Sequence, residues 1–169
     1  MDASTRGAHE DNRSAPRGNR SDPHGWNSLE NFIQVHEGRL GEHPFVDTSR
    51  PHTLRYEFFD EVFRLSGTVF CLHDVILEVT KYYGTRNSGG RVQVRGYSYR
   101  YNAHVHNGHN VLRYDNGHDD TPEEFHRHLF DRKTGAELER RIITRHELPT
   151  FSQILDELQA LFDVPPQSE

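Results

Sequence analysis

The sequence predicts an α+β fold in which a curled antiparallel sheet of about five to six strands packs against a C-terminal helix, with a short N-terminal helix as a further element. Two observations carry this prediction. Between residues 54 and 144, apolar and polar residues alternate with a period of two, which is typical of strands. After residue 149, apolar residues recur at helical spacing. A run of strands followed by a helix indicates the α+β class.

Residues that favour turns separate the predicted strands. His73-Asp74, Asn107-Gly108 and Lys133-Thr134-Gly135 each stand between two β-rich segments. At Gly96 the alternation changes parity, so a β-bulge is expected there. The predicted strand segments are residues 54–59, 68–72, 75–83, 91–106, 111–114, 124–131 and 138–144.

Two segments carry helical periodicity. Residues 26–36 place Leu29, Phe32 and Ile33 on one face. The second helix begins after Thr150, whose hydroxyl suits the N-cap position. Its apolar face is expected to pack on the sheet and consists of Phe151, Ile154, Leu155, Leu158, Leu161 and Phe162.

The composition predicts three parts. Residues 1–25 are polar without apolar periodicity, which indicates a disordered tail. Residues 26–50 hold the short helix and a linker, and residues 51–165 form a single α+β domain. No apolar run reaches the roughly 20 residues of a membrane span, and the polar start lacks a secretory signal, so we expect a cytoplasmic protein without a membrane partner.

Charge and cysteine content exclude some classes. The net charge of −6 argues against broad electrostatic capture of duplex nucleic acid. Arginine dominates the positive charges, which suits RNA binding but also fits a GC-rich genome or a salt-adapted cytoplasm. Cys71 is the only cysteine, so no internal disulfide and no zinc site built on thiolates can form.

The candidate site lies in the segment VLRYDNGHDDTPEEFHRHLF, residues 111–130. Because side chains alternate across a strand, Arg113 and Asp115 share one face of the first strand. His126 and His128 share one face of the second, about 7 Å apart by strand rise. Packing alone would be served better by aliphatic residues, so this density of polar groups indicates function.

Two imidazoles at this spacing fit metal-free RNA cleavage. One histidine takes the proton of the 2′-hydroxyl and the other protonates the leaving 5′-oxygen. A guanidinium, from Arg113 or Arg127, stabilises the charge on the phosphate, and Asp115 orients a histidine or an arginine. His118 is a further catalytic candidate. No cofactor is required. The sequence thus predicts a metal-independent ribonuclease.

Other uses of these residues remain open. His104, His106, His126 and His128 would form a four-imidazole divalent-metal site on a β-barrel if their strands are neighbours. The polar sheet face would alternatively dock a protein partner without catalysis. Tyr99 and Tyr101 fit either a packed sheet face or a base-stacking surface for single-stranded RNA.

The order YSYRYN, LRYDNGHDD, FHRHLFD and a C-terminal amphipathic helix resembles the TumE-type toxins of prokaryotic toxin–antitoxin pairs, over roughly residues 54–162. The spacing departs from that pattern, because Asp119, Asp120, Thr121 and Pro122 follow the first motif and Arg127 separates the histidine pair. The resemblance implies the toxin of a type II toxin–antitoxin system, neutralised by a helix-turn-helix antitoxin, whereas action on RNA is predicted from the site residues alone. The residues that carry over are Arg113, Tyr114, Asp115, Asn116, His118, His126 and His128, with Glu78 as an acidic residue on an earlier strand; Tyr114, Asn116, Arg127, Tyr99, Tyr101 and Glu78 are the substrate-binding candidates.

Overall fold

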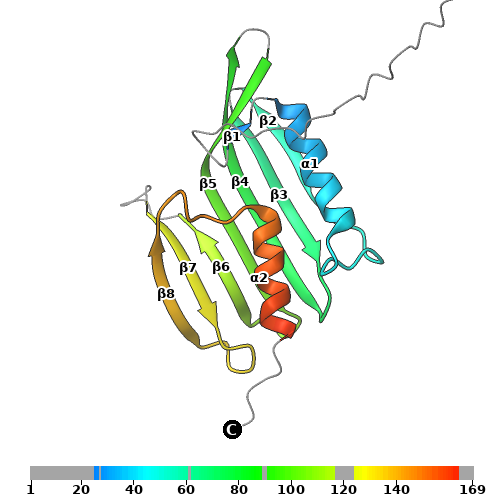
Figure 1. Ribbon diagram of the computed structural model, residues 1–169, viewed down its shortest axis with the longest axis vertical. Helices are drawn as coiled ribbons and strands as arrows, with labels where there is room; N and C mark the ends of the chain where they lie inside the picture. The colour runs from blue at the N-terminus through cyan, green and yellow to red at the C-terminus, as the bar shows by residue number, and fades with distance from the viewer. Residues whose placement is uncertain (1–24, 27, 61, 89–90, 117–123, 164–169) are drawn as a thin grey trace, which may run out of the picture.

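The computed structural model describes residues 25–26, 28–60, 62–88, 91–116 and 124–163, and within them the chain forms one open antiparallel sheet with two helices (Figure 1). The strands of the sheet follow one another in the order β2-β3-β4-β5-β6-β7-β8, and the short β1 pairs with β5. The elements are β1 (Gly25–Trp26), α1 (Leu29–Glu42), β2 (Arg55–Phe59), β3 (Val62–Phe70), β4 (Val75–Ser88), β5 (Arg91–Val105), β6 (Asn110–Asp115), β7 (Phe125–Phe130), β8 (Glu137–Ile143) and α2 (Phe151–Asp163).

This architecture confirms the predicted α+β class, with seven strands in the main order where the sequence predicted about five to six. The N-terminal helix is also present, but it occupies Leu29–Glu42 and extends beyond the predicted end at residue 36. Its N-cap is Ser28, whose hydroxyl accepts a hydrogen bond from the Asn31 backbone amide at 3.4 Å. Of the predicted tail, residues 1–25, all but Gly25 lie outside the described residues, and Gly25 begins β1.

The predicted turns join neighbouring strands. His73 and Asp74 both have positive φ, 57° and 56°, as the two central residues of a tight β3–β4 hairpin turn require. Gly108, with a φ of 83°, turns β5 into β6. In β5, the register shifts where Tyr83 pairs with Gly96 and Tyr82 with Ser98, which is the predicted bulge.

Both helices lie on the same face of the sheet (Figure 1), and the core is built there. Alternate residues of β4 and β5 point into this core, among them Leu77, Val79 and Tyr99. From α1, the Phe32 ring meets those of Phe63 and Tyr83 edge-on, with centroids 5.5 and 4.8 Å away. From α2, the buried residues are Phe151, Ile154, Leu155 and Leu158.

At the start of α2, the Gln153 side chain bonds back to Thr150, which is one half of a capping box. The Gln153 side-chain oxygen accepts hydrogen bonds from the Thr150 backbone amide at 2.8 Å and from its hydroxyl at 3.0 Å. This satisfies a backbone donor that the first helical turn would otherwise leave unpaired. The helix begins directly after Thr150, as predicted.

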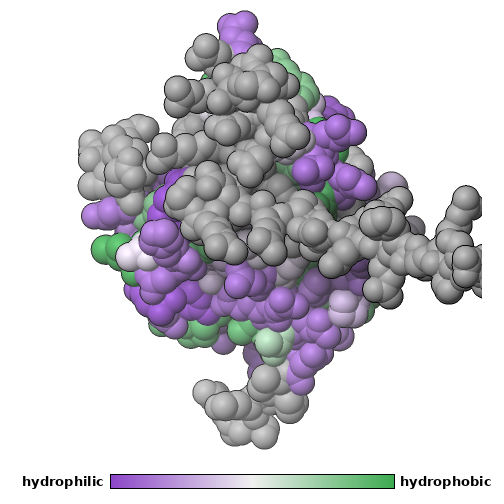
Figure 2. All heavy atoms as spheres, turned by 45° about the horizontal axis from the view of Figure 1, so that its top comes forward, coloured by the Kyte–Doolittle hydropathy of each residue, from purple (hydrophilic) through white to green (hydrophobic). Residues whose placement is uncertain are grey.

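The opposite face of the sheet, called here the helix-free face, is covered by no helix of the described residues. Its central row runs across neighbouring strands as Thr68, Glu78, Asn102, Arg113 and His128, each paired with the next in register. Most of the described surface visible in Figure 2 is hydrophilic, with hydrophobic residues in small patches. Among the described residues, no helix is long and apolar enough to cross a membrane.

Candidate functional site

The candidate site lies on β6 and β7, which are antiparallel neighbours. In their register, Arg113 faces His128 and Asp115 faces His126. These four side chains share the helix-free face, because Leu112 and Tyr114, at the alternate positions of β6, are buried on the other side. The structure therefore brings together the guanidinium, the carboxylate and the two imidazoles that the sequence singled out.

Arg113 lies between the acid and the second histidine. Its Nε is 2.7 Å from Asp115 Oδ2, and one of its terminal nitrogens is 3.3 Å from His128 Nε2. Because an arginine can only donate, His128 Nε2 accepts this hydrogen bond and carries no proton in this arrangement. His128 therefore presents a basic nitrogen toward the cationic group of the site.

The other nitrogen of His128 is fixed by Glu137, at the first position of β8. His128 Nδ1 lies 2.6 Å from Glu137 Oε1 and donates to it. This hydrogen bond holds the pKa of the Glu137 carboxyl below its usual value, so the carboxylate stays charged. A charged acceptor at Nδ1 fixes both the ring orientation and the tautomer of His128.

The sequence reasoning missed Glu137, because the last predicted strand began at residue 138. The sequence did contain a signal that could have found Glu137. The Lys133-Thr134-Gly135 turn brings the start of β8 back against the end of β7, where Glu137 pairs with Phe130. The Glu137 carboxylate therefore lies next to His128, although the two residues are nine positions apart in the sequence.

His126 has a different environment. Its Nδ1 lies 3.9 Å from Asp115 Oδ1, and its Nε2 lies 3.4 Å from Glu124 Oε2. The two imidazole rings are 6.0 Å apart between centroids, close to the separation expected from strand rise. His128 thus has a guanidinium and a carboxylate beside it, whereas His126 lies between two carboxylates.

The imidazoles are more buried than the polar groups around them. His126 is 1% and His128 3% exposed, and the Phe130 ring stacks on His128 at a centroid distance of 6.2 Å. The side chains of Arg113 and Asp115 are 30% and 13% exposed. A ligand approaching this face therefore meets the guanidinium first, and reaches the imidazoles through it.

Tyr114 and Arg127 lie on the helix-covered face, away from the two histidines. Both bind Glu157 of α2: the Tyr114 hydroxyl donates to Oε2 at 2.6 Å, and Arg127 donates to Oε1 from Nε at 2.9 Å and from a terminal nitrogen at 2.6 Å. Burial and the hydrogen bond to Glu157 raise the pKa of the Tyr114 hydroxyl well above its usual value. This network fastens α2 to β6 and β7.

The position of Glu157 gives a stability prediction. Glu157→Gln is expected to lower the free energy of unfolding by about 2 kcal/mol, because Arg127 and Tyr114 lose the charged acceptor of a partly buried network. The neighbouring change Asp156→Asn is the matched control, since Asp156 is 69% exposed in its ion pair with His43 and is expected to cost about 1 kcal/mol or less. Urea unfolding of both variants measures the difference, and equal losses would contradict the assignment.

Four further residues were predicted for the site, namely Tyr99, Tyr101, Asn116 and His118. Tyr99 and Tyr101 are each 1% exposed and belong to the core beneath α2, so neither ring is presented to solvent. Asn116 is also buried, and its side-chain oxygen accepts a hydrogen bond from the Tyr99 backbone amide at 2.8 Å. It extends the pairing of β5 and β6 beyond the last residue of β6. His118 lies outside the described residues.

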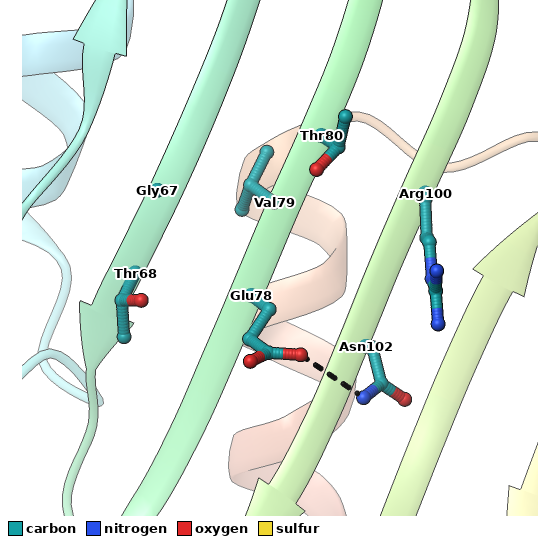
Figure 3. A pocket seen from close by; sticks show the side chains of 7 residues that line it. All are labelled: Gly67, Thr68, Glu78, Val79, Thr80, Arg100 and Asn102. Atoms are coloured by element: carbon teal, nitrogen blue, oxygen red, sulfur yellow. Dashed lines mark hydrogen bonds between the residues drawn. The ribbon is translucent and has the colours of Figure 1, made fainter.

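Glu78, in contrast, lies on the helix-free face in a hollow of about 350 Å³ (Figure 3). The side chains of Glu78, Arg100 and Asn102 stand in front of the strands, with α2 behind the sheet. Asn102 Nδ2 donates to Glu78 Oε2 at 3.3 Å, and Arg100 lies beside them on β5. Asn102 pairs with Arg113 across β5 and β6, so the hollow adjoins the candidate site.

The alternative metal site, formed by His104, His106, His126 and His128, required that the strands carrying these histidines be neighbours. His104 is on β5, and β6 lies between β5 and β7, which carries His126 and His128. Within the described ranges, no group of three or more histidine, cysteine, aspartate or glutamate residues is arranged to hold a metal ion.

An open antiparallel sheet with arginine, aspartate and two histidines on its helix-free face defines a candidate acid–base site for an anionic substrate. Residues 36–163 match the family described as Toxin TumE, and the chain belongs to this family. Membership supports a toxin role and implies an antitoxin partner. No curated protein and no solved structure matches the chain.

Proposed function

We propose that this toxin is a metal-independent ribonuclease whose site is formed by Arg113, Asp115, His126 and His128. The observation that carries the proposal is the placement of both imidazoles and the guanidinium on one face of β6 and β7. A phosphodiester needs a base, an acid and a positive charge around it for cleavage without a metal. These four side chains supply all three.

The two histidines take different roles in this mechanism. His128 is the base, because Glu137 holds its Nδ1 proton and leaves Nε2 as the acceptor. Nε2 removes the 2′-hydroxyl proton, and the 2′-oxygen attacks the adjacent phosphorus. His126, between the Asp115 and Glu124 carboxylates, donates a proton to the leaving 5′-oxygen. The products are a 2′,3′-cyclic phosphate and a 5′-hydroxyl.

Arg113 couples substrate binding to the base. In the free protein its guanidinium donates to His128 Nε2 and pairs with Asp115. A phosphate competes for the same donors and offers bidentate geometry. Binding of the phosphate therefore draws the guanidinium off Nε2 and makes the lone pair available for the 2′-hydroxyl.

The cellular setting of this proposal is a type II toxin–antitoxin pair. The antitoxin is a helix-turn-helix protein that binds the toxin and blocks its action on cellular RNA in the cytoplasm. Family membership supports the partner. Antitoxin bound over the helix-free face would keep the toxin inactive while both proteins are present.

A second candidate function is a binding module without catalysis. The burial of His126 and His128 favours it, because buried imidazoles also serve to hold a sheet together. In that case the helix-free face docks a partner protein. A histidine substitution distinguishes the two functions. In a ribonuclease it removes cleavage alone, whereas in a binding module it removes complex formation as well.

The direct test uses the toxin purified free of its antitoxin and single-stranded RNA, with a chelator present. Cleavage in chelator supports the proposal. Cleavage that is lost in chelator and returns on adding a divalent metal would assign the histidines to a metal enzyme. No cleavage with or without metal would favour the binding module.

The role of Glu137 gives a second prediction. Glu137→Gln keeps a hydrogen-bond acceptor but removes the negative charge beside His128, so the cleavage rate is expected to fall roughly 10-fold or more. Glu139→Gln, two residues along β8 and bound to Arg127 on the other face, is the control. An unchanged cleavage rate in Glu137→Gln would remove this positioning role.

A further inference from the structure

The hollow around Glu78 has no part in the cleavage step, but its size and its polar groups suit a small ligand. Its volume of about 350 Å³ falls at the lower end of the range of small-molecule pockets. Figure 3 shows the carboxylate of Glu78 and the amide of Asn102 facing one another across β4 and β5, with Arg100 above Asn102 on the same strand. A negative and a positive group therefore lie side by side on an otherwise neutral floor of small and hydroxyl-bearing residues.

The carboxylate is held in place but retains accepting capacity. Asn102 donates to Oε2 at 3.3 Å, which fixes the carboxylate without neutralising it. A carboxylate has about four lone-pair positions on its two oxygens, so both oxygens can accept further bonds. Glu78 and Arg100 are exposed, and a ligand can reach both.

Among the four RNA bases, guanine matches this pair of groups. Its Watson–Crick edge presents two adjacent donors, N1–H and N2–H, which a carboxylate can accept as a bidentate pair. Its O6 and N7 are acceptors, which an arginine can contact in the same way. Adenine and cytosine each offer an amino donor beside an acceptor nitrogen, and uracil offers a single donor between two acceptors. None of these three can satisfy both oxygens of a carboxylate.

The hollow also lies at the right place relative to the cleavage site. Asn102 forms one of its walls and pairs with Arg113 on the next strand, a spacing of about 4.8 Å. On the adjacent row, Arg100 pairs with Asp115. A nucleotide whose base occupies the hollow therefore places its phosphate toward Arg113 and His128.

We propose that the Glu78 hollow binds a guanine base of single-stranded RNA and directs cleavage to the phosphate that follows it. Glu78 accepts from the N1–H and N2–H edge, and Arg100 donates to the O6 and N7 edge. This inference rests on the proposed ribonuclease function and adds its base preference.

The test has a binding arm and a cleavage arm, both with the full chain free of antitoxin. In the binding arm, calorimetry compares GMP with AMP, CMP and UMP. GMP is expected to bind tightest, and Glu78→Gln is expected to weaken GMP binding roughly 10-fold or more, because an amide cannot accept from both donors. Glu30→Gln, an exposed change on α1, is the control. Absent GMP binding, four equal affinities, or an unchanged GMP affinity in Glu78→Gln would overturn the proposal.

In the cleavage arm, the cut positions in an RNA containing all four bases are mapped for the wild type and Glu78→Gln. The wild type is expected to cut after guanine, and Glu78→Gln to cut without that preference. Cleavage without base preference in the wild type overturns the guanine site and leaves the ribonuclease standing. Preferential GMP binding without any cleavage would support the guanine site and contradict the ribonuclease function.

Discussion

His128→Asn is expected to lower the rate of RNA cleavage by roughly 10²- to 10⁴-fold, the usual contribution of a general base. The physical reason is that Nε2 is the basic nitrogen that lies beside Arg113, and Nδ1 is the atom that Glu137 fixes. Asparagine is uncharged and can bond to one of these partners, but it cannot accept a proton near neutral pH. Cells expressing the variant are expected to grow normally.

The control for this variant is His146→Asn, because His146 is exposed in the loop before α2. Its cleavage rate and toxicity are expected to equal those of the wild type. Antitoxin binding and urea unfolding are measured on both variants, because a buried residue is changed in His128→Asn. Loss of antitoxin binding together with toxicity, in a variant that still unfolds cooperatively, would favour the binding module.

The second large effect concerns Lys81, which is buried in the core at 3% exposure. Its ammonium lies over the rings of Tyr83, Tyr99 and Tyr101, at 5.0 to 5.3 Å from their centroids. Burial lowers the pKa of Lys81 from 10.5 to about 7. That drop corresponds to roughly 5 kcal/mol at most, and cation–π attraction to the rings offsets part of it.

The sign of the pH dependence follows from this lowered pKa. The unfolded chain binds the Lys81 proton up to its ordinary pKa of 10.5, whereas the folded chain releases it near pH 7. The cost of charging Lys81 is therefore fully present below pH 7 and is relieved as the pH rises toward 10.5. Lysine at this position makes the wild type more stable at pH 9 than at pH 6.

Lys81→Met is accordingly expected to raise the free energy of unfolding at pH 6 by about 2 kcal/mol and to flatten its rise between pH 6 and pH 9. Lys133→Met is the matched control, because Lys133 is the only other lysine and is exposed in the β7–β8 turn. Urea unfolding at several pH values measures both variants. A wild-type stability that does not rise over this range, or a Lys81→Met variant that is less stable at pH 6, would contradict a buried, costly ammonium.

The sheet could be predicted because the features that indicate it, alternation and turn residues, lie close together in the sequence. Period-two alternation reports which residues share a face, and the His73-Asp74 and Asn107-Gly108 turns adopt the positive φ values that their residue types tolerate. The same parity placed Arg113 with Asp115 and His126 with His128. Antiparallel pairing of β6 with β7 then made these two pairs a single cluster.

The parts that could not be predicted depend on contacts between distant segments. Glu157 reaches Arg127 and Tyr114 only because α2 packs on that face of the sheet. Glu137 reaches His128 through the pairing of β7 and β8. Lys81 is a different case, because it shares parity with Val79 and Tyr83 and its burial could have been predicted from the alternation.

The central claim is that two imidazoles and a guanidinium cleave RNA by attack of its own 2′-hydroxyl. The most direct measurement is the chemistry of the ends that the antitoxin-free toxin leaves on a defined RNA, determined by mass spectrometry. A 2′,3′-cyclic phosphate with a 5′-hydroxyl is the predicted result. A 3′-hydroxyl with a 5′-phosphate would contradict it, because those ends require attack by water rather than by the 2′-oxygen.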